Sequence, residues 1–157
     1  LATQRGGPPW EEGLRGFHPF WMLRNLSNNV HALLAAELDA TADGATYGGE
    51  AAGGIAMHAA IEALAAGAID QALVVAYDQL RQPEIRVERG AALSEAAAAI
   101  VLGPTGGARV TAATGPAIES PYGAPALLIE AVRLRERGGT AIQSAPPGNV
   151  VGIRVTP

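Results

Sequence analysis

The sequence predicts an α/β fold in which helices pack on a small sheet. Two apolar runs of strand length, at 71–77 and 96–102, are typical of strands inside a sheet. Apolar residues at helical spacing precede the first run and return near the carboxyl end of the chain. Helices that alternate with strands favour a layered α/β arrangement. The chain has 157 residues, which is the length of one domain.

Residues 1–16 are expected to form a loose lead-in, because Gly, Pro and charged residues prevail there and no apolar period is visible. A single domain is expected over 17–157. It begins with most of the large apolar residues of the chain, which either close a core or lie against another subunit. These residues are Phe17, Phe20, Trp21, Met22 and Leu23.

The first helix is expected to be capped by Ser27 or Asn28 and to end near Asp39. Residues 43–44 then form a turn, and 45–47 can form a short strand. The helix is predicted from apolar residues that recur at helical spacing, namely Val30, Leu33, Leu34 and Leu38.

The second helix is expected over 51–66 and is stopped by Gly67. Only His58 and Glu62 are polar in this segment, so the helix is expected to be buried on most sides. Most of its residues are small, and neighbouring elements should therefore approach it closely.

The run 71–77 predicts a central strand covered on both faces, with Asp78 at its carboxyl end. Asp78 is interpreted as a turn cap or, alternatively, as a residue that lines a crevice. After a loop around 83–89, the run 96–102 predicts a second strand that could pair with the first. Further on, the expected elements are a strand at 109–113, a helix at 125–137 ended by Gly138 and Gly139, and a last strand at 150–155.

Composition and charge exclude several classes of function. The net charge is −4 and the Arg residues are scattered, which argues against nucleic-acid binding. No apolar run reaches the roughly 20 residues that cross a bilayer, and no amino-terminal signal is visible, so a cytoplasmic protein with no membrane partner is expected.

Metal and disulfide chemistry are not expected either. The chain has no Cys, which excludes disulfides and Cys-based zinc sites. The three His residues, at 18, 31 and 58, lack the spacing of metal ligands. His31 and His58 fall within helical segments, where a hydrogen-bonded packing role is the simplest interpretation.

Segments between residues 23 and 102 have the order and spacing of a known family. Glu50-Ala51-Ala52-Gly53-Gly54 stands where synthases of that family have Cys-x-x-Gly and where their cysteine-free relatives have Gln-x-Gly-Gly. Together the segments resemble the β-ketoacyl synthases of the thiolase fold, and in particular the short relatives called chain length factors. The other matching segments are 25–32, 63–70 followed by 72–75, 75–79 with Pro83 beyond it, and 94–97.

The resemblance implies a thiolase-like, layered helix/sheet/helix fold reduced to about one half of the duplicated fold. It also implies a non-catalytic subunit without a cofactor, because the chain lacks the nucleophilic Cys and has no His after position 58. Such a subunit forms a heterodimer with a β-ketoacyl synthase in type II polyketide, polyene or fatty-acid-like biosynthesis. Acyl carrier protein would then meet the complex rather than this chain.

The resemblance also implies where the subunit shapes the acyl tunnel of its partner. Thr46, Tyr47 and Gly48 would lie in or near the strand at the dimer axis, where the aromatic ring of Tyr47 is the expected stop for the growing chain. Candidates for the same interface and tunnel wall are Phe20, Trp21 and Leu26.

Two alternative functions and a structural role for Glu50 stay open at this point. Glu50 can simply stabilise the start of the second helix through the helix dipole. It can also be the catalytic group of a malonyl-carrier decarboxylase or acyl-transfer enzyme, although a carboxylate repels an anionic substrate and has no amide donor for an enolate. The third possibility is a homodimeric binding protein with a degenerate thiolase-like frame.

Overall fold

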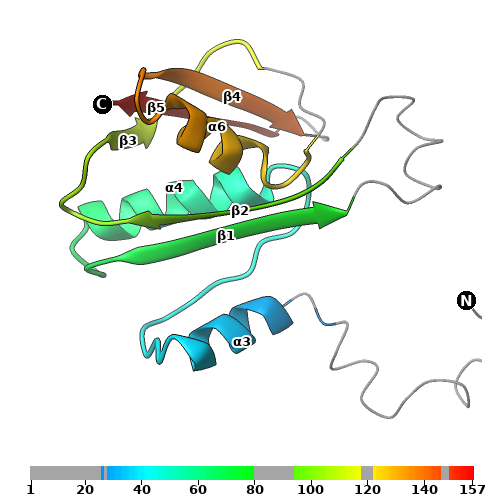
Figure 1. Ribbon diagram of the computed structural model, residues 1–157, viewed down its shortest axis with the longest axis vertical. Helices are drawn as coiled ribbons and strands as arrows, with labels where there is room; N and C mark the ends of the chain where they lie inside the picture. The colour runs from blue at the N-terminus through cyan, green and yellow to red at the C-terminus, as the bar shows by residue number, and fades with distance from the viewer. Residues whose placement is uncertain (1–25, 27, 80–93, 118–121, 146–148) are drawn as a thin grey trace, which may run out of the picture. The chain divides into compact units, whose positions relative to one another are not determined.

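The computed structural model describes residues 26, 28–79, 94–117, 122–145 and 149–157. Within these ranges the protein is a small mixed α/β fold with three helices and two antiparallel sheets (Figure 1). Contacts divide the chain into two compact units, Leu1–Thr46 and Tyr47–Pro157. The expected boundary between residues 16 and 17 lies outside the described residues.

The described part of the first unit contains one helix, α3 (Asn29–Glu37). It confirms the helix predicted from the apolar spacing, and Asn28 occupies the N-cap position without a side-chain hydrogen bond. The chain leaves the helix through Asp39, whose φ is 50°. No residue of α3 is buried, and Leu33 is 70% exposed. The prediction of a short strand at 45–47 is wrong, because these residues pair with no strand among the described residues.

The second unit begins with a helix and an antiparallel strand pair. The helix is α4 (Ala52–Ala65), and the strands are β1 (Ala72–Gln79) and β2 (Glu95–Leu102). The register runs without interruption from Ala72 opposite Leu102 to Gln79 opposite Glu95. Both predicted strands and their pairing are therefore confirmed.

Burial is less complete than the sequence suggests. In β1, Val74 and Ala76 are buried, whereas Leu73 and Tyr77 on the opposite face are exposed. The expectation that β1 is a central strand covered on both faces is therefore wrong, because its two-stranded sheet packs on helices through one face only. Burial of α4 on most sides is also wrong, since its fully buried residues all lie in the amino-terminal half, namely Ala52, Gly53, Gly54 and Met57.

The rest of the second unit contains a second sheet and a second helix. The sheet has the order β3-β5-β4 and is antiparallel. The predicted helix and the predicted strands at 109–113 and 150–155 are present, but β4 was not expected. Gly138 and Gly139 both have positive φ and turn the chain from the helix directly into β4. The elements are β3 (Arg109–Ala112), α6 (Ala126–Leu134), β4 (Gly139–Ala145) and β5 (Asn149–Thr156).

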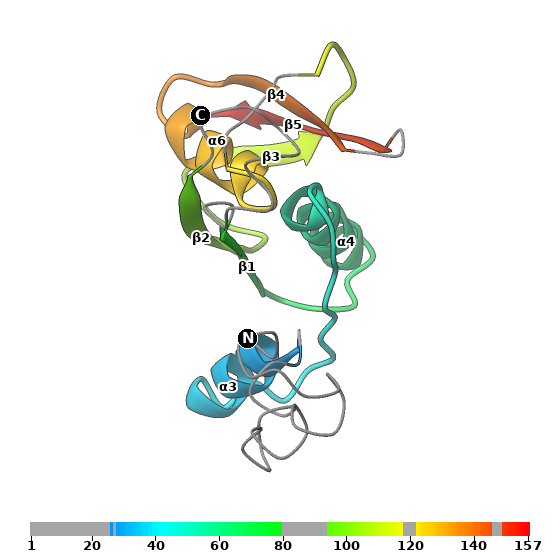
Figure 2. The same ribbon diagram turned by 90° about the vertical axis from the view of Figure 1, so that its right-hand side faces the viewer.

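Within the second unit, α4 and α6 pack against each other and both contact strands of the two sheets (Figure 2). The helices thus lie between two sheets, whereas the expected order was one sheet between helices. Residues of both helices and of strands from both sheets share one apolar core. The order helix, strand, strand occurs twice, first as α4-β1-β2 and then as α6-β4-β5.

Candidate functional site

The amino-terminal ends of α4 and α6 meet through a pair of glycines. A Cβ atom on Gly53 would overlap the carbonyl oxygen of Ala124 and would lie 2.8 Å from the Cβ of Ala76. A Cβ on Gly54 would lie 2.5 Å from the Leu127 Cδ1. Contacts this short are not tolerated, so the two glycines allow α6 to approach α4. The expected close approach is confirmed at these two positions.

Gln143 of β4 links the segments that lead into both helices. Its Nε2 donates one hydrogen bond to the Glu50 carbonyl oxygen at 2.8 Å and one to the Gly123 carbonyl oxygen at 2.9 Å. The side chain is only 4% exposed, and its Oε1 has no hydrogen-bond partner among the described residues. Because both neighbours are acceptors, the amide nitrogen must face them.

Asp78 connects the end of β1 to the start of α6. Its Oδ2 accepts a hydrogen bond from the backbone N–H of Ala124 at 3.1 Å. The N-cap of α6 is Pro125, which makes no side-chain cap hydrogen bond, so the carboxylate of Asp78 supplies an acceptor just before the helix. Of the two interpretations of Asp78, the structure favours the cap.

Glu50 lies one residue before Ala51, the N-cap of α4. Ala51 has no side-chain acceptor that could cap the helix. Glu50 is the acidic residue nearest to this helix end along the chain. The side chain of Glu50 is half-buried, and its backbone carbonyl is held by Gln143. The segment that resembles the site of the nucleophile is thus held by the buried side-chain amide of Gln143 in β4.

The hydrogen bonds at this junction bear on decarboxylation by Glu50. An enolate formed from a malonyl group requires a hydrogen-bond donor directed at its oxygen. The Gln143 amide is the side-chain amide next to Glu50, and both of its N–H groups are already donated to backbone carbonyls. Only an acceptor, Oε1, remains, and an acceptor would repel the developing anion.

The other candidate residues fall into different parts of the chain. Tyr47 and Gly48 open the second unit, just before Glu50, and Tyr47 is 39% exposed. Thr46 and Leu26 are exposed and belong to the first unit. Phe20 and Trp21 lie outside the described residues. Of the candidate residues, Tyr47, Gly48 and Glu50 thus lie in one short segment before α4.

Each of the two described histidines contacts another segment of its own unit. The Nε2 of His58 donates a hydrogen bond to the Gly152 carbonyl oxygen at 2.6 Å, which ties α4 to β5. His31 is exposed, and its ring lies against Gly44 within the first unit. The interpretation of His58 as a hydrogen-bonded packing residue is confirmed.

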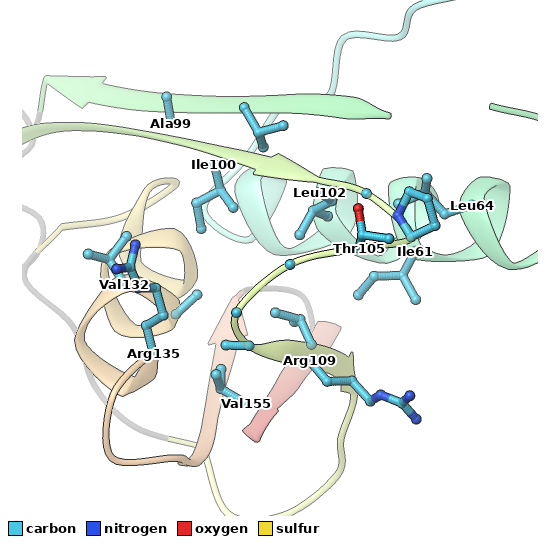
Figure 3. Close-up of a pocket in the computed structure, with 18 residues that line it drawn as sticks. Ile61, Leu64, Ala99, Ile100, Leu102, Thr105, Arg109, Val132, Arg135 and Val155 are labelled. Carbon is cyan, nitrogen blue, oxygen red and sulfur yellow. The ribbon is translucent and has the colours of Figure 1, made fainter. Parts of the chain in front are cut away.

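A hollow of about 670 Å³ opens between the two sheets of the second unit (Figure 3). Ile61 and Leu64 reach it from α4, Ile100 and Leu102 from β2, and Val155 from β5. Sequence reasoning missed both this hollow and the role of Gln143. A single Gln in a short segment after two glycines carries no signal of burial, and the hollow depends on how two sheets are spaced.

No protein-family model, curated protein or solved structure matches the chain. Among the described residues, no group of three or more His, Asp or Glu side chains is placed to hold a metal ion. A search of the same residues finds no helix with the length and apolarity that crossing a membrane requires.

Proposed function

We propose that this chain is a non-catalytic subunit, similar to chain length factors, that pairs with a β-ketoacyl synthase and shapes its acyl tunnel. The synthase supplies the Cys and His residues that perform condensation. Acyl groups carried by acyl carrier protein are substrates of the heterodimer. The pathway is of the type II kind that makes polyketides, polyenes or fatty-acid-like chains.

The observation that carries the proposal is the position of Glu50. The residue stands where the resemblance places the nucleophile, directly before the first turn of a helix that contains the Gly-Gly pair. A carboxylate is a poorer acceptor than a thiolate for an acyl group from a carrier thioester, because the mixed anhydride it would form is less stable than the thioester. The neighbouring Gln143 amide donates both of its N–H groups to backbone carbonyls. These observations favour a role through shape and contact.

One feature compatible with a thiolase-like frame is the repeated order of elements, although the layers differ from the expected helix/sheet/helix order. A helix followed by an antiparallel pair of strands occurs twice, as expected if the frame descends from a duplicated fold. The two helices pack together at their amino-terminal ends, where Gly53 meets Ala124.

Tyr47 is the residue proposed to limit chain length. It lies three residues before Glu50, and its ring is partly exposed, so a neighbouring subunit can reach it. A rigid ring in a tunnel wall blocks extension, because a longer acyl chain would have to overpack a filled site. A glycine at this position would open the wall.

The test is co-expression of the chain with a β-ketoacyl synthase, followed by size-exclusion chromatography and analysis of product length. The Tyr47→Gly variant should shift the products to longer chains without loss of the heterodimer. Tyr47→Phe, which keeps the ring, should give the same products as the unaltered chain. An unchanged distribution with Tyr47→Gly would reject Tyr47 as the stop.

Two outcomes would replace the proposal. Release of carbon dioxide from malonyl-carrier by the purified chain, lost in Glu50→Ala, would assign decarboxylation to Glu50. A homodimer that does not associate with any synthase would instead assign the chain to a binding role.

A further inference from the structure

Two hollows lie end to end along β2. The larger has a volume of about 670 Å³ and is bordered by residues 99–102 of the strand. The smaller, of about 400 Å³, is bordered by residues 97–99. They share Ala99 and Val132, and together they follow β2 over six consecutive residues, 97–102.

Consecutive lining residues identify an edge of the strand rather than a face. Successive side chains of a strand point to opposite faces, so a hollow on one face would be lined by every second residue. Here Ala97, Ala99 and Val101 line the hollows together with the residues between them. One edge of β2 pairs with β1, and its other edge has no partner strand among the described residues. The hollows therefore follow a strand edge that no other strand of the described ranges covers.

The free edge of β2 lacks the features that usually prevent strand addition. Such features are Lys or Pro residues, bulges or very short strands. β2 has eight residues, of which only Glu95 is charged, and its register with β1 has no bulge. An edge of this kind is suited to accept one more strand.

Apolar side chains of the two helices and three arginines line the hollows. Ile61, Leu64, Ile129 and Val132 line them from the helices. Arg109, Arg133 and Arg135 also line them, whereas no Asp or Glu does. Arg133 binds Glu130 at 2.7 Å, but Arg109 and Arg135 pair with no carboxylate in the described ranges. Arg109 and Arg135 thus place two positive charges beside the hollows, while β2 itself carries Glu95 at its amino end.

We propose that the free edge of β2 binds an extended segment of a partner protein by strand addition. The segment has bulky apolar side chains at alternate positions, which fill the two hollows, and acidic residues at its ends, which face the arginines. Six residues of extended chain span about 20 Å, the length of strand that borders the hollows. This inference is independent of the pairing with a synthase.

A second copy of β2 fits the same edge less well. Residues 96–99 are all Ala, so a paired copy would place methyl groups where the hollows offer room for larger side chains. A copy would also bring a second set of arginines close to those that already line the hollows. The partner is therefore a different segment with larger side chains.

The probe is a fluorescein-labelled peptide with the sequence Glu-Leu-Thr-Val-Thr-Leu-Thr-Glu, titrated with the full chain by fluorescence anisotropy. A peptide of the same composition without alternation, Glu-Leu-Leu-Val-Thr-Thr-Thr-Glu, serves as the control. We expect saturable binding of the first peptide and at least about tenfold weaker binding of the second.

Two N-methylated forms of the probe test the backbone pairing. One carries methyl groups on the odd residues and the other on the even residues. Only every second N–H of an added strand points toward its neighbour, so one form should lose binding and the other should retain it. Equal binding of both forms and the unmodified peptide would overturn the proposal.

Substitutions in the chain locate the site. Val132→Arg should weaken binding of the probe at least about tenfold, because Val132 lines both hollows. Val150→Arg is the matched control, since Val150 has the same 57% exposure and lines neither hollow. Arg135→Glu should weaken binding, whereas Arg137→Glu should not. Circular dichroism of each variant checks that the fold is kept.

Three further results would overturn the inference. The first is the absence of saturable binding by the probe. The second is binding that Val132→Arg and Val150→Arg affect equally. The third is a homodimer that Val132→Arg dissociates, since this would assign the edge to a second copy of the chain.

Discussion

Replacing Gly53 by alanine tests whether the junction of α4 and α6 depends on the missing side chain. The added Cβ would overlap the backbone carbonyl oxygen of Ala124 and would lie 2.8 Å from the Ala76 Cβ and 3.0 Å from the Leu128 Cδ1. A backbone oxygen cannot move away as the end of a flexible side chain can. The helix ends must therefore separate, which also disturbs the hydrogen bond from Ala124 to Asp78.

The expected magnitude results from two opposing effects. An alanine within a helix is more favourable than a glycine by about 1 kcal/mol. Overpacking of a filled core costs about 1–3 kcal/mol, and the contact with a backbone oxygen places Gly53→Ala at the upper end of that range. We expect a net loss of about 1–2 kcal/mol in the free energy of unfolding. Gly54→Ala should cost less, because its added Cβ meets only the side chains of Leu127 and Val151.

Urea unfolding followed by circular dichroism measures both variants against Gly48→Ala. A Cβ added to Gly48 would meet no atom within 4 Å, so this variant should change stability by less than about 0.5 kcal/mol. The expected order of destabilisation is Gly53→Ala, then Gly54→Ala, then Gly48→Ala. A Gly53→Ala variant at least as stable as the unaltered protein would refute the close approach of the two helices.

Three further changes test the hydrogen bonds of the second unit. Asp78→Ala should lower the free energy of unfolding by about 1 kcal/mol through loss of the acceptor for the Ala124 N–H, while Asp70→Ala at an exposed turn should not, as thermal unfolding would show. Gln143→Glu should destabilise by about 2–3 kcal/mol at neutral pH, because a buried carboxylate would face two carbonyl oxygens. That burial raises the pKa of the introduced carboxyl in the folded state, so stability should recover as the pH falls, and a pH-independent loss would contradict the assigned geometry. His58→Ala should cost about 1 kcal/mol in urea unfolding by removing the hydrogen bond to the Gly152 carbonyl, and an unchanged midpoint would exclude that bond as a stabilising contact.

The sequence predicts the elements with strong local patterns. The apolar run before Asp78 and the alanine-rich run of β2 are continuous, and both form strands that pair as expected. The helices at 29–37 and 126–134 follow from the spacing of their leucines. In each case the signal lies within one segment, so the pattern alone determines the type of element.

Features that depend on contacts between distant segments could not be predicted from the sequence. A continuous apolar strand is typical of burial on both faces, but only the helix-facing side of β1 is buried here. β4 follows directly after Gly138 and Gly139, which indicate the end of a helix and not what comes next. The burial of Gln143 depends on two carbonyls that lie 93 and 20 residues away. No local pattern encodes contacts at such separations.

We propose that this chain acts by contact with a condensing partner and is not itself acylated. Native mass spectrometry of the chain co-expressed with a β-ketoacyl synthase and supplied with acyl carrier protein tests it directly. We expect a one-to-one heterodimer in which the acyl group is covalently bound to the synthase alone. An acyl adduct on this chain, or its complete failure to associate with the synthase, would contradict a non-catalytic role as the synthase's partner.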